Sequence, residues 1–144
     1  MHRDLAHRLV CDEDPDRVYV PMGAGAHVDH VSLHWAVMGL MPKWRANNPK
    51  IRVFIYEDLP YASMNYRCFL SVLDRLKKSQ RVSPVFEDIA DTLVDKIWAI
   101  GVYQSQPYQY FQRCAYPYAH QMGIEMGEGR GHSAERLWEL EPLA

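Results

Sequence analysis

Two short apolar runs, each bounded by turn-forming residues, are the clearest elements of the chain. They cover residues 17–20 and 51–56, and their length and β-branched content predict buried strands. Between them, apolar positions from Val28 to about Met41 occur on almost every side of a helix, so this helix should be central and buried, and Pro42 should end it. A strand, a helix and a second strand in this order predict a crossover between parallel strands of one sheet.

The pattern after the second strand predicts two more helices and a loop. The first helix covers about 64–78, and the second begins at Ser83, with Pro84 in its first turn, and continues to about Trp98. The tyrosine-rich stretch 103–118 is interpreted as packing for a mobile, half-buried loop, with stacking against sugar rings as the alternative. With only two convincing strands, one face or edge of the sheet should be open. The expected inner face of the first helix consists of Cys68, Phe69, Val72, Leu73 and Leu76.

Composition excludes several classes of partner. Sixteen Lys and Arg residues against eighteen Asp and Glu leave a net charge of −2, which does not favour nucleic acid binding. No apolar run has the length of a transmembrane helix and the start does not resemble a secretion signal, so we expect a cytoplasmic protein. Three scattered cysteines argue against a disulfide framework and are expected to be small core residues.

The segment from Pro21 to His30 carries the strongest candidate chemistry. Gly23 and Gly25 let the chain turn after the first strand, and the next helix should begin near Val28. His27 and His30, three positions apart, should then lie on one side of its first turn. Neutral imidazole is the commonest metal ligand, and zinc accepts nitrogen donors. The alternative is a surface loop in which Asp29, between the two histidines, caps the helix.

A second segment changes the balance between these alternatives. Glu57-Asp58-Leu59-Pro60-Tyr61-Ala62 follows the second strand, and together with the histidine segment it resembles the LmbE-like family of metal-dependent N-deacetylases, which includes the N-acetylglucosaminyl-phosphatidylinositol deacetylases. Residues 100–106 and 134–138 add to the likeness, which spans about residues 17–140. The resemblance implies a Rossmann-like three-layer α/β sandwich and a zinc-dependent hydrolase that removes N-acetyl groups from N-acetylglucosamine-type sugars or glycoconjugates.

The resemblance also implies roles for individual residues. His30 would be a metal ligand, and His27, as a protonated imidazole, would stabilise the tetrahedral intermediate and donate to the leaving amine. Asp29 would orient one of the two rings by a hydrogen bond. A zinc-bound water would be the nucleophile. Glu57 and Asp58 are candidate substrate-binding residues, with a purely structural role in the loop as the alternative.

One departure from the family pattern limits these expectations. Family members carry a His-Pro-Asp-Asp motif on their first strand, and the chain has only His2-Arg3-Asp4-Leu5 in an early position. We therefore expect residues 1–144 to be a single partial domain, the C-terminal portion of such a deacetylase, lacking the N-terminal strands and inactive alone. His34, one turn beyond His30, is the nearest replacement ligand, although a structural histidine is the simpler interpretation. The competing hypothesis is a non-catalytic α/β sugar-binding or oligomerisation module, and we expect a homo-oligomer in either case.

Overall fold

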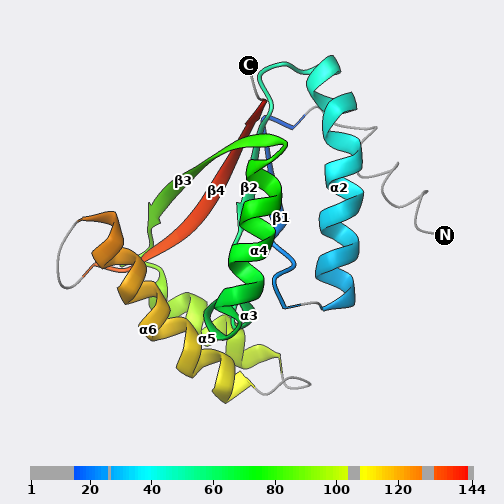
Figure 1. The fold of residues 1–144 in the computed structure, drawn as a ribbon. Coiled ribbons are helices and arrows are strands. Elements are labelled where there is room, and N and C mark those ends of the chain that lie inside the picture. Colours follow the sequence, from blue (N-terminus) through cyan, green and yellow to red (C-terminus); the bar gives the residue numbers. More distant parts are fainter. Residues whose placement is uncertain (1–14, 26, 104–107, 128–131, 143–144) are drawn as a thin grey trace.

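The computed structural model describes residues 15–25, 27–103, 108–127 and 132–142, which form a mixed α/β fold with one sheet (Figure 1). The sheet has four strands in the order β1-β2-β4-β3. β1 and β2 are parallel, whereas β4 runs antiparallel to both of its neighbours. The strands are β1 (Arg17–Pro21), β2 (Arg52–Tyr56), β3 (Gln80–Asp88) and β4 (Ala134–Pro142).

The helices of the described residues occupy two places around this sheet. Two of them, α2 and α4, contribute to the same hydrophobic core as the strands and lie on one face of the sheet. The other long helices, α5 and α6, contact each other and cover the end of the β3–β4 ribbon (Figure 1). The helices are α2 (Val28–Asn47), the short α3 (Tyr61–Met64), α4 (Tyr66–Lys77), α5 (Leu93–Val102) and α6 (Tyr108–Met126).

The main core lies between the sheet and the two helices on that face. Its side chains come from alternate positions of the strands and from one stripe of each helix, as expected for a pleated sheet covered by amphipathic helices. Each such side chain contributes about 1.5 to 3 kcal/mol when fully buried. The members include Val20 of β1, Val53 and Ile55 of β2, Val37, Met41 and Trp44 of α2, Phe69, Leu73 and Leu76 of α4, and Trp138 and Leu140 of β4.

The structure confirms both predicted strands, their parallel pairing and the helix predicted over 64–78. Pro21 lies opposite Tyr56 in the β1–β2 register, and the Met22 amide donates to the Tyr56 carbonyl over 3.0 Å. The two chain segments that follow these strands therefore leave the sheet side by side. Residues 22–25 and 27–30 meet residues 57–62 at this edge.

Two predictions about α2 were wrong. Pro42 lies within the helix, which continues to Asn47, because Met41 and Trp44 are buried against the core and outweigh the missing amide of the proline. The helix is also not buried all round, since Val28 is 70 % exposed and Trp35 52 % exposed. Its buried face carries His34, Val37, Met41 and Trp44.

The helix predicted from Ser83 to Trp98 was wrong in its first part and right in its last part. Residues 80–88 form β3, which pairs with β4 along its whole length, from Gln80 opposite Pro142 to Asp88 opposite Ala134. Ser83 and Pro84 are local helix-start signals, but a long antiparallel partner supplies more hydrogen bonds than a helix start, and β3 is an edge strand where proline is tolerated. The helix α5 begins only at Leu93.

The tyrosine-rich stretch was wrongly assigned to a mobile loop, because α6 begins at Tyr108 and contains Pro117. Its buried side chains, Ala115, Ala119 and Met122, recur at helical spacing. The small alanines let α6 pack closely, and the tyrosines lie at the edges of its buried face. The positions of the aromatic residues alone therefore do not distinguish a helix from a loop. Ser105 and Gln106, which belong to the stretch 100–106 that adds to the likeness, lie outside the described residues.

The prediction that the cysteines are core residues was wrong for Cys68. Cys68 is exposed rather than in the core, and Cys114 is half-buried. Cys11 lies outside the described residues. The expectation that Cys68 would face the core was wrong because the α4 stripe is narrower than predicted: only Phe69, Leu73 and Leu76 are buried.

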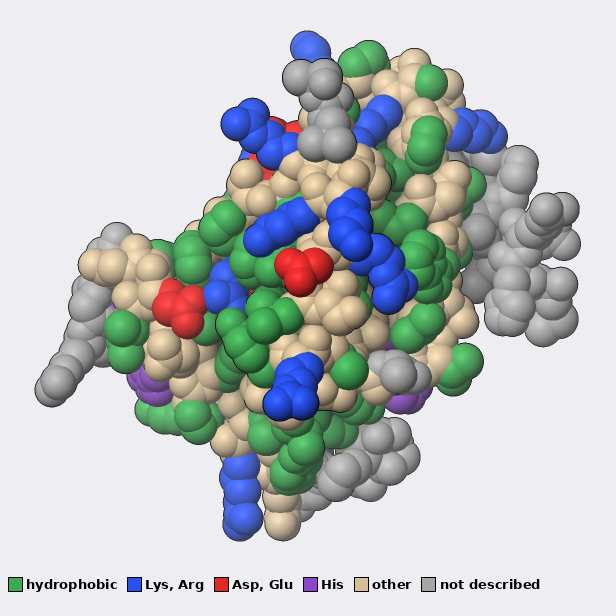
Figure 2. Space-filling view, viewed as in Figure 1, with side chains coloured by type: hydrophobic (Ala, Val, Ile, Leu, Met, Phe, Trp, Pro, Cys, Tyr) green, Lys and Arg blue, Asp and Glu red, His purple; other side chains and the backbone are tan. Residues whose placement is uncertain are grey.

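The face of the molecule that carries α4 mixes basic and apolar side chains. Lys and Arg side chains gather over α4 in Figure 2, with hydrophobic side chains between them and few acidic groups. Arg67, Arg75 and Lys78 line a shallow depression there together with Asp74. Among the residues that the structure describes, no helix is both long enough and apolar enough to span a bilayer.

Candidate functional site

The loop after β1 places two histidines at the start of α2. Gly23 has a φ of +73°, a left-handed conformation that favours glycine. Gly25 lies against the ring of Tyr61, and a Cβ added there would be 2.1 Å from Tyr61 Cγ. The loop can approach α3 this closely only without a side chain at position 25. Both glycines are therefore needed for the path that leads to His27.

His27 and His30 lie next to each other, as the sequence predicts. Their ring centroids are 5.0 Å apart, and the ring of Tyr61 lies near both, with centroids 6.2 Å from His27 and 5.9 Å from His30. His27 is the N-cap residue of α2, and its Nδ1 accepts a hydrogen bond of 3.3 Å from the Asp29 backbone amide. The α2 N-terminus thus holds the first of the two rings.

The carboxylate that contacts His30 comes from the segment after β2 rather than from the same helix. Oδ2 of Asp58 lies 2.8 Å from Nδ1 of His30, and the Asp58 side chain is 1 % exposed. Oδ1 of Asp58 is buried and has no hydrogen-bond partner among the described residues. The Asp29 carboxylate, by contrast, is 83 % exposed and lies 3.9 Å from Nδ1 of His27. Asp58 is therefore the carboxylate best placed to orient an imidazole here.

Glu57, the neighbour of Asp58, points to a different set of groups. Its Oε1 accepts from Nε of Arg136 over 2.6 Å and from the Trp138 indole over 2.7 Å, and its Oε2 accepts from the Tyr118 hydroxyl. Arg136 also donates to Glu125 at 2.6 Å. Because the Glu57 side chain is 3 % exposed, it joins the end of β2 to α6 and β4 in a buried polar network.

Protonation within this network follows from its burial and charges. Burial raises the pKa of the Tyr118 phenol, and the adjacent Glu57 carboxylate raises it further. Burial alone would lower the pKa of Arg136, but the hydrogen bond with Glu57 and the nearby charges of Glu57, Tyr118 and Glu125 together outweigh burial and raise it. Tyr118 is therefore a neutral donor and Arg136 a cation at neutral pH, which is the pairing that a buried carboxylate requires.

A cavity of about 540 Å³ connects the histidines with this network. Its size is that of a small-molecule site. One wall is polar, formed by the two histidines, the two carboxylates and the Lys96–Glu135 ion pair of 2.5 Å. The other walls are apolar or aromatic, from Tyr56, Leu59, Ile100, Tyr103, Phe111 and Ala115. All the predicted site residues except Asp29 line this cavity.

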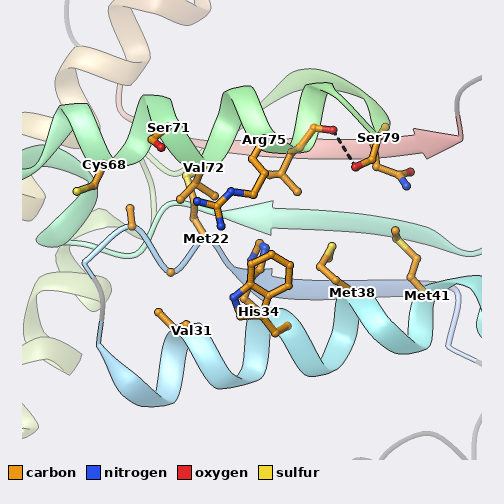
Figure 3. Close-up of a pocket in the computed structure, with 15 residues that line it drawn as sticks. Met22, Val31, His34, Met38, Met41, Cys68, Ser71, Val72, Arg75 and Ser79 are labelled. Atoms are coloured by element: carbon orange, nitrogen blue, oxygen red, sulfur yellow. Dashed lines mark hydrogen bonds between the residues drawn. The ribbon is translucent and has the colours of Figure 1, made fainter.

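A second cavity, of about 360 Å³, lies between α2 and α4 and is less suited to chemistry (Figure 3). Met22, Val31, Met38 and Val72 point into it, while Arg75 extends from α4, with its guanidinium 5.7 Å from the Trp35 ring centroid. His34 lies here, buried, with Nδ1 2.9 Å from the Pro21 carbonyl. His34 is thus a hydrogen-bonded structural histidine that lies one turn along α2 from His30 and lines this cavity rather than the one that contains His30.

A catalytic zinc ion takes about three protein ligands. His30 offers one nitrogen, since its Nδ1 is occupied by Asp58 and its Nε2 is not. Within the described parts of the chain, no group of three or more His, Cys, Asp or Glu side chains is arranged to hold a metal ion. These residues alone therefore do not fit a complete zinc site.

Comparison with known proteins gives one informative similarity. The chain is 33 % identical over 96 residues to a 2'-N-acetylparomamine deacetylase from Streptomyces fradiae, and the matched region covers 66 % of the chain and 32 % of that enzyme. The chain thus spans about a third of its relative's length. No protein-family model matches the chain, and no solved structure matches it. The similarity supports a relationship to deacetylases, and hence to hydrolases acting on amide bonds; the mixed α/β fold is compatible with a Rossmann-like architecture.

Sequence reasoning missed several residues that shape the site. Tyr61, Lys96, Tyr118 and Arg136 line the cavity, yet none was named as a site residue, although Tyr118 belongs to the stretch 103–118 for which stacking against sugar rings was the alternative. Arg136 and Trp138 could have been found, because they are two positions apart on one strand and must point to the same face. Tyr118 could not, since nothing in the sequence brings α6 to the end of β2.

Proposed function

We propose that the chain carries one half of the active site of an N-deacetylase that acts on an N-acetylated aminosugar or glycoconjugate. The observation that carries the proposal is the pairing of His30 with Asp58, beside His27, in one cavity at the carboxyl ends of two parallel strands. Open α/β sheets commonly bind ligands at this edge. The similarity to a 2'-N-acetylparomamine deacetylase supports the same reaction class.

The cavity offers separate surfaces for the two parts of such a substrate. Its aromatic side, with Tyr61, Tyr103 and Phe111, suits the flat face of a sugar ring, while the histidines suit the polar acetamido group. His27 would donate a hydrogen bond to the acetyl carbonyl oxygen as negative charge develops on it. Once protonated on both ring nitrogens, it would pass one proton to the departing amine and return to the neutral form. Asp29 would act on His27 only from the solvent side, because its carboxylate is exposed.

Zinc remains part of the proposal. His30 would supply one ligand, and the remaining ligands would come from outside the described residues, since these contain no set of three donors. A bound zinc ion supplies an activated water in hydrolases of amide bonds. Glu57 would hold the site together rather than touch the substrate, because both of its oxygens are engaged by protein donors.

The second candidate function is a sugar-binding module without catalysis. The incomplete set of metal donors among the described residues favours it. A homo-oligomer is proposed for either function and would be detected by sedimentation. Sugar binding measured with and without a zinc chelator separates the two functions, because a binding module is indifferent to chelation whereas a metal-centred site is not.

The decisive test is deacetylation of N-acetylglucosamine, N-acetylparomamine and N-acetylglucosaminyl-phosphatidylinositol by this chain and by a longer protein that includes a His-Pro-Asp-Asp strand. We expect release of acetate from at least one of these substrates by the longer protein. His30→Gln and His27→Gln should each abolish it, while His132→Gln, which alters a histidine outside the cavity, should not. Absence of activity from both proteins would refute the proposal.

A further inference from the structure

The hydrogen bonds of His27 and His30 assign a different tautomer to each ring. A backbone amide can only donate, so Nδ1 of His27, which accepts from the Asp29 amide, carries a lone pair. The hydrogen of a neutral His27 then lies on Nε2. A carboxylate can only accept, so Nδ1 of His30, 2.8 Å from Asp58, carries a hydrogen, and the lone pair of His30 lies on Nε2.

We infer that Asp58 is a positioning residue and that the two adjacent imidazoles are held in opposite tautomers, one as an N–H donor and the other as a lone-pair donor. The rings are 5.0 Å apart and line the same cavity. Such a pair can contact a carbonyl oxygen with one Nε2 and a cation with the other. Neither ring needs to move, or to exchange a hydrogen with water, before it makes its contact.

The burial of Asp58 supports a dedicated role over a chance contact. Its side chain is 1 % exposed, and one of its two oxygens has no partner among the described residues. Burying a carboxylate costs free energy unless it is well paired. If Asp58 served only to stabilise the loop, saturation of both oxygens would be expected, as at Glu57. Instead, within the described parts of the chain, its one side-chain hydrogen bond is with the imidazole at the cavity.

His34 provides an internal reference for the experiment. It lies on the same helix, one turn beyond His30, and its Nδ1 is 2.9 Å from the Pro21 carbonyl. A carbonyl can only accept, so neutral His34 must carry its hydrogen on Nδ1. His34 should therefore show the same tautomer as His30, and His27 should show the opposite one.

The test is nitrogen-15 NMR of the histidine rings at about pH 9, where an ordinary imidazole is neutral. Protonated and unprotonated ring nitrogens have well-separated shifts, and His27→Gln, His30→Gln and His34→Gln assign the signals. We expect a hydrogen on Nδ1 of His30 and His34 and on Nε2 of His27. The same tautomer in His27 and His30, or a rapidly averaged mixture in either ring, overturns the inference.

Variants at Asp58 and Asp29 test the cause of each tautomer. In Asp58→Ala, His30 should no longer favour the tautomer with the hydrogen on Nδ1. Asp58→Asn keeps an acceptor oxygen in the same position and should restore part of this preference. The tautomer of His34 should be unchanged in both variants. Asp29→Ala should leave the His27 tautomer unchanged, because the amide that His27 accepts from remains. An unaltered His30 tautomer in a folded Asp58→Ala protein refutes the positioning role.

This inference deepens the proposed function, since it concerns the same histidines, but its readout is ring protonation rather than hydrolysis. The two can therefore fail separately. Opposite tautomers without any deacetylation would leave the positioning role intact and refute the enzyme. Deacetylation with a single shared tautomer would do the reverse.

Discussion

Two neighbouring carboxylates at the end of β2 differ in almost everything except burial. Glu57 accepts from Arg136, Trp138 and Tyr118, so that both of its oxygens are engaged. Asp58 contacts one partially exposed histidine and leaves one oxygen unpaired within the described residues. A fold that supplies hydrogen-bond donors to both oxygens of Glu57 could also supply them to both oxygens of Asp58. The difference indicates that Glu57 secures the architecture and that Asp58 is reserved for the cavity.

Of the variants that test this comparison, Glu57→Ala should cause the largest loss of stability. It would leave the Arg136 charge largely buried without its main partner, and removing one member of a buried ion pair costs about 3 to 5 kcal/mol. We expect a loss of that size in the free energy of unfolding measured with urea. Asp58→Ala removes a single hydrogen bond and should cost about 1 kcal/mol. Equal losses for the two variants would contradict the division of roles.

Tyr118→Phe tests the same network through its neutral donor. Oε2 of Glu57 would be left buried without a partner, which costs about 1 to 3 kcal/mol. Urea unfolding at neutral pH measures the loss, and Tyr116→Phe, an exposed tyrosine on the same helix, is the matched control.

The Tyr118 network also predicts a dependence on alkaline pH. Because the folded state raises the pKa of Tyr118 above its ordinary value of about 10, stability from this group is fully present below about pH 10 and is lost as the pH rises through the folded pKa. Urea unfolding between neutral pH and pH 11 should show the decline. Tyr118→Phe should show a smaller one, and identical slopes would mean that other groups cause it.

Two glycine substitutions test the loop that carries His27, on the Asp58 side of the comparison. Gly25→Ala would force a Cβ against Tyr61, so the loop that carries His27 must shift, at a cost of about 1 to 3 kcal/mol. Gly39→Ala, within α2, meets nothing within 4 Å and should stabilise the protein by about 1 kcal/mol. Thermal unfolding of the two variants should give shifts of opposite sign. A stabilised Gly25→Ala protein would disprove the close approach.

The smallest effect is expected from a carboxylate remote from both. Glu139 receives hydrogen bonds of 2.7 and 2.9 Å from Arg52 on the exposed part of the sheet. These bonds lower the pKa of Glu139, so its stabilisation is present at neutral pH and is lost as the pH falls through the folded pKa. Glu139→Gln should change urea unfolding less than Glu57→Ala, Tyr118→Phe or Asp58→Ala, and only above about pH 4. A larger loss than that of Asp58→Ala would reverse the ranking.

Sequence reasoning worked where local pattern and tertiary structure agree. The runs 17–20 and 51–56 are apolar because they are central to a core, and the helix over 66–77 has a clear apolar stripe, so all three were predicted. It also brought His27 and His30 together, since three positions on a helix fix their separation. The roles assigned to His27, Asp29, His30, Glu57 and Asp58 stay predictions.

The errors occurred where a distant segment decides the outcome. Residues 80–88 carry helix-start signals but pair with β4, which lies some fifty residues later in the chain. The Asp58–His30 contact is likewise set by the register of β1 against β2. A periodicity argument cannot see either pairing, because both depend on hydrogen bonds between segments far apart in the sequence.

The position of β1 has a consequence for how the molecule can be assembled. Among the described residues β1 pairs with β2 alone, so its outer edge presents backbone amides and carbonyls to an incoming segment. A further strand laid parallel to it would finish beside Gly23 and the histidine loop. Any additional donor groups carried at the end of that strand would then arrive at the cavity through backbone pairing alone, whether the strand came from the same polypeptide or from a separate one.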